Sequence, residues 1–295
     1  MCVEAFEPEM KTLVDPAAEL DHLAGGFQFT EGPVWDRARG CLFFSDIPAN
    51  KIYRYTLASG AVLYRQPSHF SNGLTLDYEG RLLACEHQAR RVTRENANGV
   101  TVLAERYQGK RLNSPNDIVV MRDGSLIFTD PHYGLLPGLG GPAEAELSFR
   151  GVYRLAPGAT ELTLLVDDFE APNGLALTAD ERRLYIDDSE RCHLRVFDVR
   201  DNGSLAGGGI VLEHPRGMGP DVPDGLKLDA QDNVYCTGPG GVWVISPAGS
   251  VIGRIHMPEV TANLTWGDED ARGLYLTAST GLYRLRCLVG GLAHA

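Results

Sequence analysis

Six short segments of the sequence each begin with a residue whose side chain carries a carboxylate or an amide oxygen. These residues are Glu31, Asn72, Asn116, Asn173, Asp224 and Asn263. Oxygen donors bind hard cations such as Ca²⁺, Mg²⁺ and Mn²⁺, and these positions hold none of the Cys or His residues that Zn²⁺ and Cu²⁺ favour. A turn would explain any single Asn-Gly pair, but Asn116 and Asn263 are not followed by Gly. The set predicts a divalent-cation site, with Ca²⁺ as the first expectation and Mg²⁺, Mn²⁺ or Zn²⁺ as alternatives.

The six segments are the first strands of a repeat. They are EGPVWD (31–36), NGLTLD (72–77), NDIVVM (116–121), NGLALT (173–178), DGLKLD (224–229) and NLTWGD (263–268), and their starts are 41, 44, 57, 51 and 39 residues apart. Two further strand-like elements follow each segment, and a fourth follows in five of the six repeats. This period predicts an all-β, six-bladed β-propeller with four-stranded blades. The first strand of a blade lines the central tunnel, so the six polar residues should converge on one axis.

The sixth repeat ends after its third strand, so the ring needs a strand from elsewhere. We expect residues 17–23 to supply it, because a closed ring leaves no exposed strand edge. We expect surface loops at residues 132–150 and 203–209. No composition break divides residues 1–295, which predicts a single domain.

Composition excludes several classes of function. The 27 basic and 39 acidic residues give a net charge of −12, which disfavours binding to nucleic acid or to an anionic membrane. No stretch approaches the length of about 18 apolar residues that a membrane span needs, and the N-terminus has no secretory-signal pattern. None of the six cysteines forms a CxxC pair, which predicts free thiols and a cytoplasmic location. The oligomeric state stays open.

Five longer motifs carry a family resemblance. They are TEGPVW (30–35), RLNSPNDIVV (111–120), LIFTDPHYG (126–134), PNGLAL (172–177) and PDGLKLD (223–229). From about residue 20 to 287 the chain resembles the senescence-marker-protein/gluconolactonase (regucalcin-like) family, and most of all its bacterial gluconolactonase branch.

The resemblance implies a calcium-dependent lactone hydrolase that acts on a small-molecule lactone. Its metal ligands would be Glu31, Asn173 and Asp224, with Asn116 as a fourth ligand or as a substrate contact beside the metal. Animal members carry an Arg two residues before the position of Asn116, where this chain has Ser114. The sugar contacts of the family should therefore not be copied to this chain.

The residues suggest a mechanism and leave alternatives open. A cation would polarise the lactone carbonyl, Asp224 would act as general base on water, and Glu31 would be a ligand alone. His87, His132 and Asp130 follow second strands and are predicted substrate contacts. Asp187 and Asp188 are interpreted as turn carboxylates. The same set of ligands would also suit a phosphotriesterase, an aryl esterase or a calcium-binding propeller without enzymatic activity.

Overall fold

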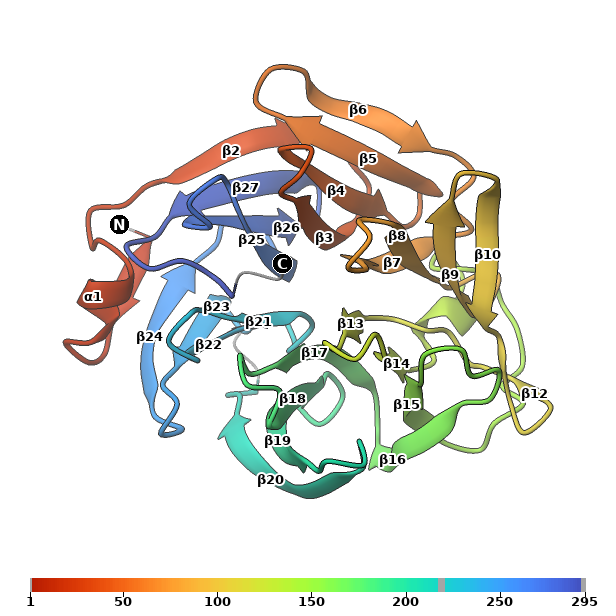
Figure 1. Cartoon of the computed structure of the whole chain (residues 1–295). Helices are drawn as coiled ribbons and strands as arrows, with labels where there is room; N and C mark the ends of the chain where they lie inside the picture. The colour runs from red at the N-terminus through yellow and green to blue at the C-terminus, as the bar shows by residue number, and fades with distance from the viewer. Residues whose placement is uncertain (1, 217–220, 293–295) are drawn as a thin grey trace.

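The computed structural model describes residues 2–216 and 221–292, and it is a six-bladed β-propeller (Figure 1). Six antiparallel sheets surround a central axis, and each runs from an inner strand to an outer strand. The predicted fold class is confirmed. Among the described residues no helix is long and apolar enough to cross a membrane.

The strands of each blade follow one another along the chain. Blade one comprises β3 (Thr30–Asp36), β4 (Cys41–Asp46), β5 (Lys51–Thr56) and β6 (Gly60–Arg65). Blade two comprises β7 (Ser71–Leu76), β8 (Leu82–Glu86), β9 (Arg91–Asn96) and β10 (Gly99–Ala104). Blade three comprises β13 (Ile118–Val120), β14 (Leu126–Asp130), β15 (Arg150–Leu155) and β16 (Thr163–Phe169). Blade four comprises β17 (Pro172–Leu177), β18 (Arg183–Asp188), β19 (His193–Val199) and β20 (Leu205–Glu213). Blade five contains β21 (Leu226–Leu228), β22 (Val234–Gly238), β23 (Gly241–Ile245) and β24 (Val251–His256), and blade six contains β25 (Thr261–Gly267), β26 (Gly273–Ala278) and β27 (Gly281–Arg286).

The N-terminal segment closes the ring, as the strand count predicts. Strand β2 (Leu20–Gly25) pairs with β27, with Leu20 opposite Leu285, and becomes the outer strand of blade six (Figure 1). The strand begins three residues later than the expected segment 17–23 and ends two residues later, at Gly25. A second N-terminal strand, β1 (Val3–Ala5), pairs with β24 and adds a fifth strand to blade five. The sequence pattern did not predict β1, because three residues are too few to show an alternation.

One of the two expected surface loops is wrong. Residues 132–150 connect β14 to β15 and contain only a short 3₁₀ helix, η1 (Tyr133–Leu135). Residues 205–209 instead begin strand β20, in which Gly207 pairs with Phe197. Backbone hydrogen bonds extend the strand through Gly207, Gly208 and Gly209, and one of the two register shifts of this pair falls at Gly208. A hairpin of β11 (Arg106–Tyr107) and β12 (Lys110–Arg111) also lies outside the blades.

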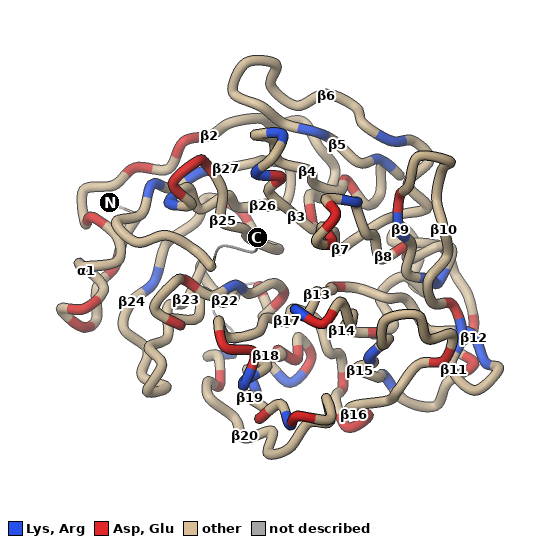
Figure 2. Tube along the Cα trace, viewed as in Figure 1, with Lys and Arg blue, Asp and Glu red and all other residues tan. Residues whose placement is uncertain are grey.

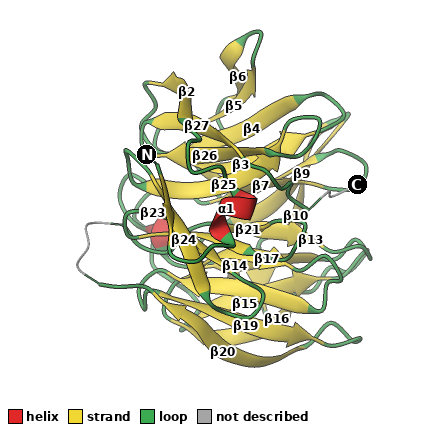
Figure 3. Ribbon diagram, turned by 90° about the vertical axis from the view of Figure 1, so that its left-hand side faces the viewer, coloured by secondary structure: helices red, strands yellow, loops and turns green. Residues whose placement is uncertain are grey.

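The hydrophobic core consists of clusters that join neighbouring blades, which stack side by side in the edge-on view of Figure 3. One cluster packs Phe43 of blade one against Leu74 of blade two. The helix α1 (Met10–Leu13) adds its buried Met10 to the cluster between blades five and six. Acidic and basic residues are interspersed along the chain (Figure 2). Pairs such as Arg195–Asp168 and Arg284–Asp21 link the third strand of one blade to an outer strand. This packing holds the inner strands, and hence their first residues, in a fixed ring.

Candidate functional site

The six repeated polar residues lie at the starts of the inner strands, at one mouth of the tunnel. We call Glu31, Asn72, Asn116, Asn173, Asp224 and Asn263 the polar ring. Asn263 Nδ2 donates to Glu31 Oε2 at 3.1 Å, and the Asp224 carboxyl lies against the Glu31 carboxyl and the Asn173 amide. The structure therefore brings the predicted ligands Glu31, Asn173 and Asp224 into direct contact.

Backbone contacts between neighbouring blades fix the ring. The amide of Gly73 donates to the carbonyl of Asn116 at 2.8 Å, and the amide of Gly174 donates to the carbonyl of Asp224 at 2.6 Å. A Cβ at either glycine would overlap that carbonyl oxygen. Neither glycine has a positive φ, so these Asn-Gly pairs serve close packing of inner strands and not a left-handed turn. Asn116 is placed by this contact and by its own amide, which donates to Thr129 O at 2.9 Å.

Three carboxylates anchor the segments that lead into the ring. Asp46, Asp130 and Asp188 each end the second strand of a blade and accept backbone N–H groups two and three residues before a ring residue. Asp130 is fully buried and accepts from Asn113 N at 2.8 Å and from Ser114 N at 2.7 Å. Burial raises its pKa to about 7, against the effect of these hydrogen bonds. The geometry of Asp130 is that of a backbone anchor, although the sequence led us to expect a substrate contact.

The polar ring fits a hard cation because several of its oxygens have no other partner. Glu31 Oε1, Asn72 Oδ1 and Asn173 Oδ1 are buried and accept no hydrogen bond. Leaving one such group unpaired costs about 1–3 kcal/mol. Ser189 Oγ donates to Pro223 O at 2.6 Å and accepts from Asn173 Nδ2 at 3.0 Å, which turns the Asn173 oxygen away from Ser189. The unpaired oxygens of Glu31 and Asn173, both predicted ligands, are suited to cation ligation.

The raised pKa values of the two carboxyl groups in the polar ring also favour a bound cation. Burial, and then the charge of Asp224, raise the pKa of Glu31 well above its usual range. Burial raises the pKa of Asp224 to about 7. A cation between the two carboxylates would relieve both effects. Among residues 2–216 and 221–292 no three His, Cys, Asp or Glu side chains form a metal cluster, so the amide oxygens of Asn116 and Asn173 would have to complete the coordination.

Of two further carboxylates near the ring, the sequence reasoning misinterpreted Asp187 and passed over Asp117. Asp187 is 0% exposed, and neither of its oxygens has a hydrogen-bond partner. Its interpretation as a turn carboxylate is wrong, whereas Asp188 does accept the amide of Arg191 in the following turn at 3.0 Å, in addition to its anchor bonds. Asp117 Oδ2 lies 3.6 Å from Lys227 Nζ, and its charge raises the pKa values of Glu31, Asp187 and Asp224.

Comparison of the blades would have revealed Asp187. The corresponding residues of the other five second strands are Ser45, Cys85, Thr129, Thr237 and Thr277. Ser45 and Thr129 donate their hydroxyls to the carbonyls of Asn72 and Asn173, each at 2.8 Å. An ionised carboxylate cannot donate in this way, so blade four breaks the pattern at a position beside the ring.

The two predicted histidines occupy different environments. His87 is 1% exposed, and both of its ring nitrogens have partners, Asn72 Nδ2 at 3.3 Å and Leu139 O at 3.0 Å. His132 is half-buried and stacks on Tyr133 with the ring centroids 4.9 Å apart. Burial, and then the charge of Arg150, lower the pKa of His132, and Glu190 and Glu170 oppose this shift.

Tyr133, which the sequence reasoning passed over, is closer to the ring than His132. Its hydroxyl contacts Ser189, and it lies near Asp224. Burial raises its pKa above the usual range. The residue therefore covers the Asp224 side of the mouth from the 132–150 loop.

A cavity of about 420 Å³ lies at the other ends of the inner strands. Trp35, Leu76 and Trp266 are among its mainly apolar lining, and no member of the polar ring lines it. This cavity and the polar ring thus lie at opposite ends of the inner strands.

Comparisons with known proteins agree with this geometry. The model of the SMP-30/gluconolactonase/LRE-like region matches residues 29–280. A gluconolactonase of Zymomonas mobilis is 30% identical over 96% of this chain and 85% of its own length. A solved structure of a gluconolactonase from Xanthomonas campestris is 32% identical, with a TM-score of 0.89 over 97% of this chain and 95% of that one. An X-ray structure of a candidate gluconolactonase is 35% identical, with a TM-score of 0.92 over 99% of this chain and all of the other.

Proposed function

Since the chain belongs to the SMP-30/gluconolactonase/LRE-like family, we propose that it is a divalent-cation-dependent lactonase that opens a sugar lactone. Relatives that span nearly the whole chain are gluconolactonases. The observation that carries the proposal is the group of buried, unpaired oxygens on Glu31 and Asn173 beside the Asp224 carboxyl. Ca²⁺ is the first expectation because the donors are all oxygen.

Glu31, Asn116, Asn173 and Asp224 would hold the cation. Its Lewis acidity would polarise the lactone carbonyl and stabilise the oxyanion. Neutral Asn116 and Asn173 limit the negative charge of the site. Ser189 keeps the Asn173 oxygen directed at the ring through the bonds described above. Of the four, Glu31 has the carboxylate whose second oxygen is already engaged by Asn263 and Gly32, which suits a ligand more than a proton carrier.

Asp224 would act as the general base. It is half-buried, whereas Glu31, Asn116 and Asn173 are buried, so a water at the mouth can reach it most readily. Water attacks the carbonyl carbon, and Asp224 takes one of the water protons. The carbonyl carbon–ring oxygen bond then breaks, and the proton passes to the leaving ring oxygen. The product is an open-chain hydroxy acid.

One experiment separates this proposal from its alternatives. Hydrolysis of glucono-δ-lactone, δ-valerolactone, phenyl acetate and a phosphotriester is measured with the purified chain, first with a chelator and then after addition of Ca²⁺, Mg²⁺, Mn²⁺ or Zn²⁺. We expect cation-dependent turnover of the sugar lactone. Turnover of the phosphotriester or the aryl ester alone would favour the other esterase activities.

Cation binding is measured on the same samples without reference to turnover. A cation that binds only the folded state should raise the unfolding free energy by about 2.7 kcal/mol at a hundredfold excess over its Kd. Stabilisation by Ca²⁺ without any turnover would indicate a calcium-binding propeller. Equal stability and equal turnover with and without chelator would contradict the metal site. The expected cytoplasmic location stays a proposal, supported by the six free cysteines.

A further inference from the structure

The ring residue Asn72 has a free oxygen that the proposed cation site does not use. Asn72 is 4% exposed, and its Oδ1 is buried without a hydrogen-bond partner. The residue lies between Glu31 and Asn116 in the order of the blades, and the backbone of Gly32 packs directly against its carbonyl group. Because an amide oxygen only accepts hydrogen bonds, its natural partner is a donor such as a hydroxyl group.

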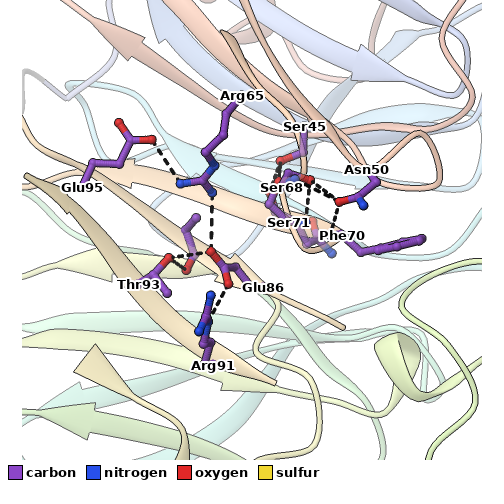
Figure 4. Close-up of polar contacts among 12 residues, drawn as sticks. Ser45, Asn50, Arg65, Ser68, Phe70, Ser71, Glu86, Arg91, Thr93 and Glu95 are labelled. Atoms are coloured by element: carbon purple, nitrogen blue, oxygen red, sulfur yellow. Dashed lines mark hydrogen bonds and ion pairs between the residues drawn. The ribbon is translucent and has the colours of Figure 1, made fainter. Parts of the chain in front are cut away.

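The backbone of Asn72 is held firmly from blade one. Ser45 Oγ lies 2.8 Å from Asn72 O and 2.9 Å from Ser71 Oγ. Asn50 Oδ1 accepts the amides of Ser68 at 2.9 Å and Phe70 at 3.0 Å (Figure 4). Asn50 thereby replaces the anchor carboxylate that blades one, three and four place at the end of their own second strand. These contacts fix the backbone from which the Asn72 side chain extends.

His87 fixes the orientation of the Asn72 side-chain amide. Its Nδ1 lies 3.0 Å from the carbonyl oxygen of Leu139, which can only accept, so Nδ1 carries the proton. Burial lowers the pKa of His87 to about 4 and keeps the ring neutral. Nε2 is then an acceptor, and its partner 3.3 Å away must be the Nδ2 donor of Asn72. This arrangement directs Asn72 Oδ1 away from His87.

His87 is itself clamped from two sides. Glu86, the preceding residue, is 1% exposed and pairs with Arg91 at 2.6 Å and Arg65 at 3.6 Å, and Thr93 Oγ1 donates to it at 3.0 Å (Figure 4). On the other side, a Cβ at Gly134 would overlap the His87 side chain, so the 132–150 loop packs tightly against the imidazole. The loop that supplies Leu139 O thus sets the tautomer.

We propose that Asn72 Oδ1 accepts a hydrogen bond from a substrate hydroxyl, and that His87 is the positioning residue that orients it. The inference rests on the proposed lactonase function and adds the residues that recognise a ring hydroxyl group of the sugar lactone. The reacting carbonyl of the lactone faces Glu31 and Asp224 in the polar ring, and Asn72 binds a hydroxyl group of the lactone. The 132–150 loop then affects selectivity through the contact of Leu139 O with His87.

The test compares two lactones that share a ring and differ in their hydroxyl groups, glucono-δ-lactone and δ-valerolactone. Asn72→Ala should lower kcat/KM for glucono-δ-lactone about tenfold, the effect of losing one well-placed hydrogen bond. The value for δ-valerolactone should change less than about twofold. Asn113→Ala, which also removes a buried asparagine but lies outside the ring, should leave the ratio between the two lactones unchanged.

The role of His87 is tested by a pair of variants. His87→Leu removes the acceptor for Asn72 Nδ2 and should lower the selectivity ratio about as much as Asn72→Ala. His87→Gln offers an amide oxygen at the place of Nε2 and should restore part of the ratio. If His87 had a purely structural role, each variant would lower kcat/KM for the two lactones by the same factor. These two variants also keep the inference testable if Asn72→Ala does not fold.

A Ca²⁺ titration in chelator-buffered solution completes the test. Asn72→Ala should keep the wild-type Ca²⁺ affinity, and a tenfold loss would make Asn72 a cation ligand and overturn the inference. An unchanged selectivity ratio in an active enzyme would overturn it as well and leave the lactonase proposal intact. A wild-type protein that hydrolyses neither lactone would contradict the lactonase proposal, and this inference with it.

Discussion

The buried neutral His87 makes a quantitative prediction about stability and pH. Burial lowers the pKa of His87 from 6.5 to about 4, so between these values the unfolded state binds a proton that the folded state does not. Stability is then complete above pH 6.5 and is lost as the pH falls towards 4. From pH 7 to pH 5 the single-site linkage relation gives a loss of about 2 kcal/mol.

Denaturant unfolding at pH 7 and pH 5 measures this loss directly. The variant His87→Gln cannot titrate in this range, so its stability should fall by about 2 kcal/mol less than that of the wild type. His214 provides a matched control, because burial lowers its pKa to about 4 as well and it lies away from the polar ring, with Cys236 Sγ 3.8 Å from its Nε2. Between pH 7 and pH 5, His214→Gln should also lose less stability than the wild type, by the same amount as His87→Gln. When the two substitutions are combined, the two reductions should add.

The comparison between variants is essential, because the ring carboxylates titrate in the same pH range. Their contribution is present in the wild type and in both variants, and it cancels in the difference. The reasoning would be refuted if the wild type and His87→Gln lost the same amount of stability from pH 7 to pH 5. His87 would then be protonated in the folded state, and Asn72 could no longer be its donor.

Three further outcomes follow from the structure. At saturating Ca²⁺, Asp224→Asn should stay roughly 10²–10⁴-fold slower than wild type in lactone turnover, whereas Glu31→Gln should recover much of its rate; rescue of both would make Asp224 a ligand only. Deletion of residues 1–25 removes β2 from its pairing with β27 and should lower the unfolding midpoint of the whole propeller, so an unchanged midpoint would contradict ring closure. Asp188→Ala and Asp46→Ala each leave two or more backbone N–H groups unpaired and should each cost about 2–6 kcal/mol in denaturant unfolding; a loss below 0.5 kcal/mol would show that these carboxylates are not anchors.

The repeat made the fold and the ring predictable from the sequence. Each blade starts with the same element, so its register places one polar residue per blade at the tunnel mouth, and Glu31, Asn173 and Asp224 do meet there. The missing fourth strand likewise required closure from the N-terminus, and β2 provides it. These predictions depend on periodicity and strand pairing, which are visible in a single sequence.

Side-chain roles were harder to predict, because they depend on which hydrogen bonds are already satisfied. Asp130 and Asp187 look alike in the sequence, since each lies at or next to the end of a second strand. In the structure two backbone amides occupy the carboxylate of Asp130, while both oxygens of Asp187 are free. Tyr133 was missed because it lies in the 132–150 loop, whose conformation cannot be predicted from the repeat.

Positions at which one blade deviates from the others indicate functional residues better than any single residue type does. Four ring residues are followed by Gly, which lets inner strands approach closely, but Asn116 is followed by Asp117. Five second strands place a hydroxyl or a thiol where blade four places Asp187. Both substitutions add a buried carboxyl group near Asp224. Burial, and then the charges of Asp224 and Asp117, raise the pKa values of Glu31 and Asp187. Burying like charges together opposes folding, and neither residue is needed to form its blade, because the other blades form without it. A cation bound by the polar ring would compensate this burial. The cost of the acidic cluster without a cation is therefore the strongest physical reason to propose the ring, and not the apolar cavity at the other ends of the inner strands, as the functional site.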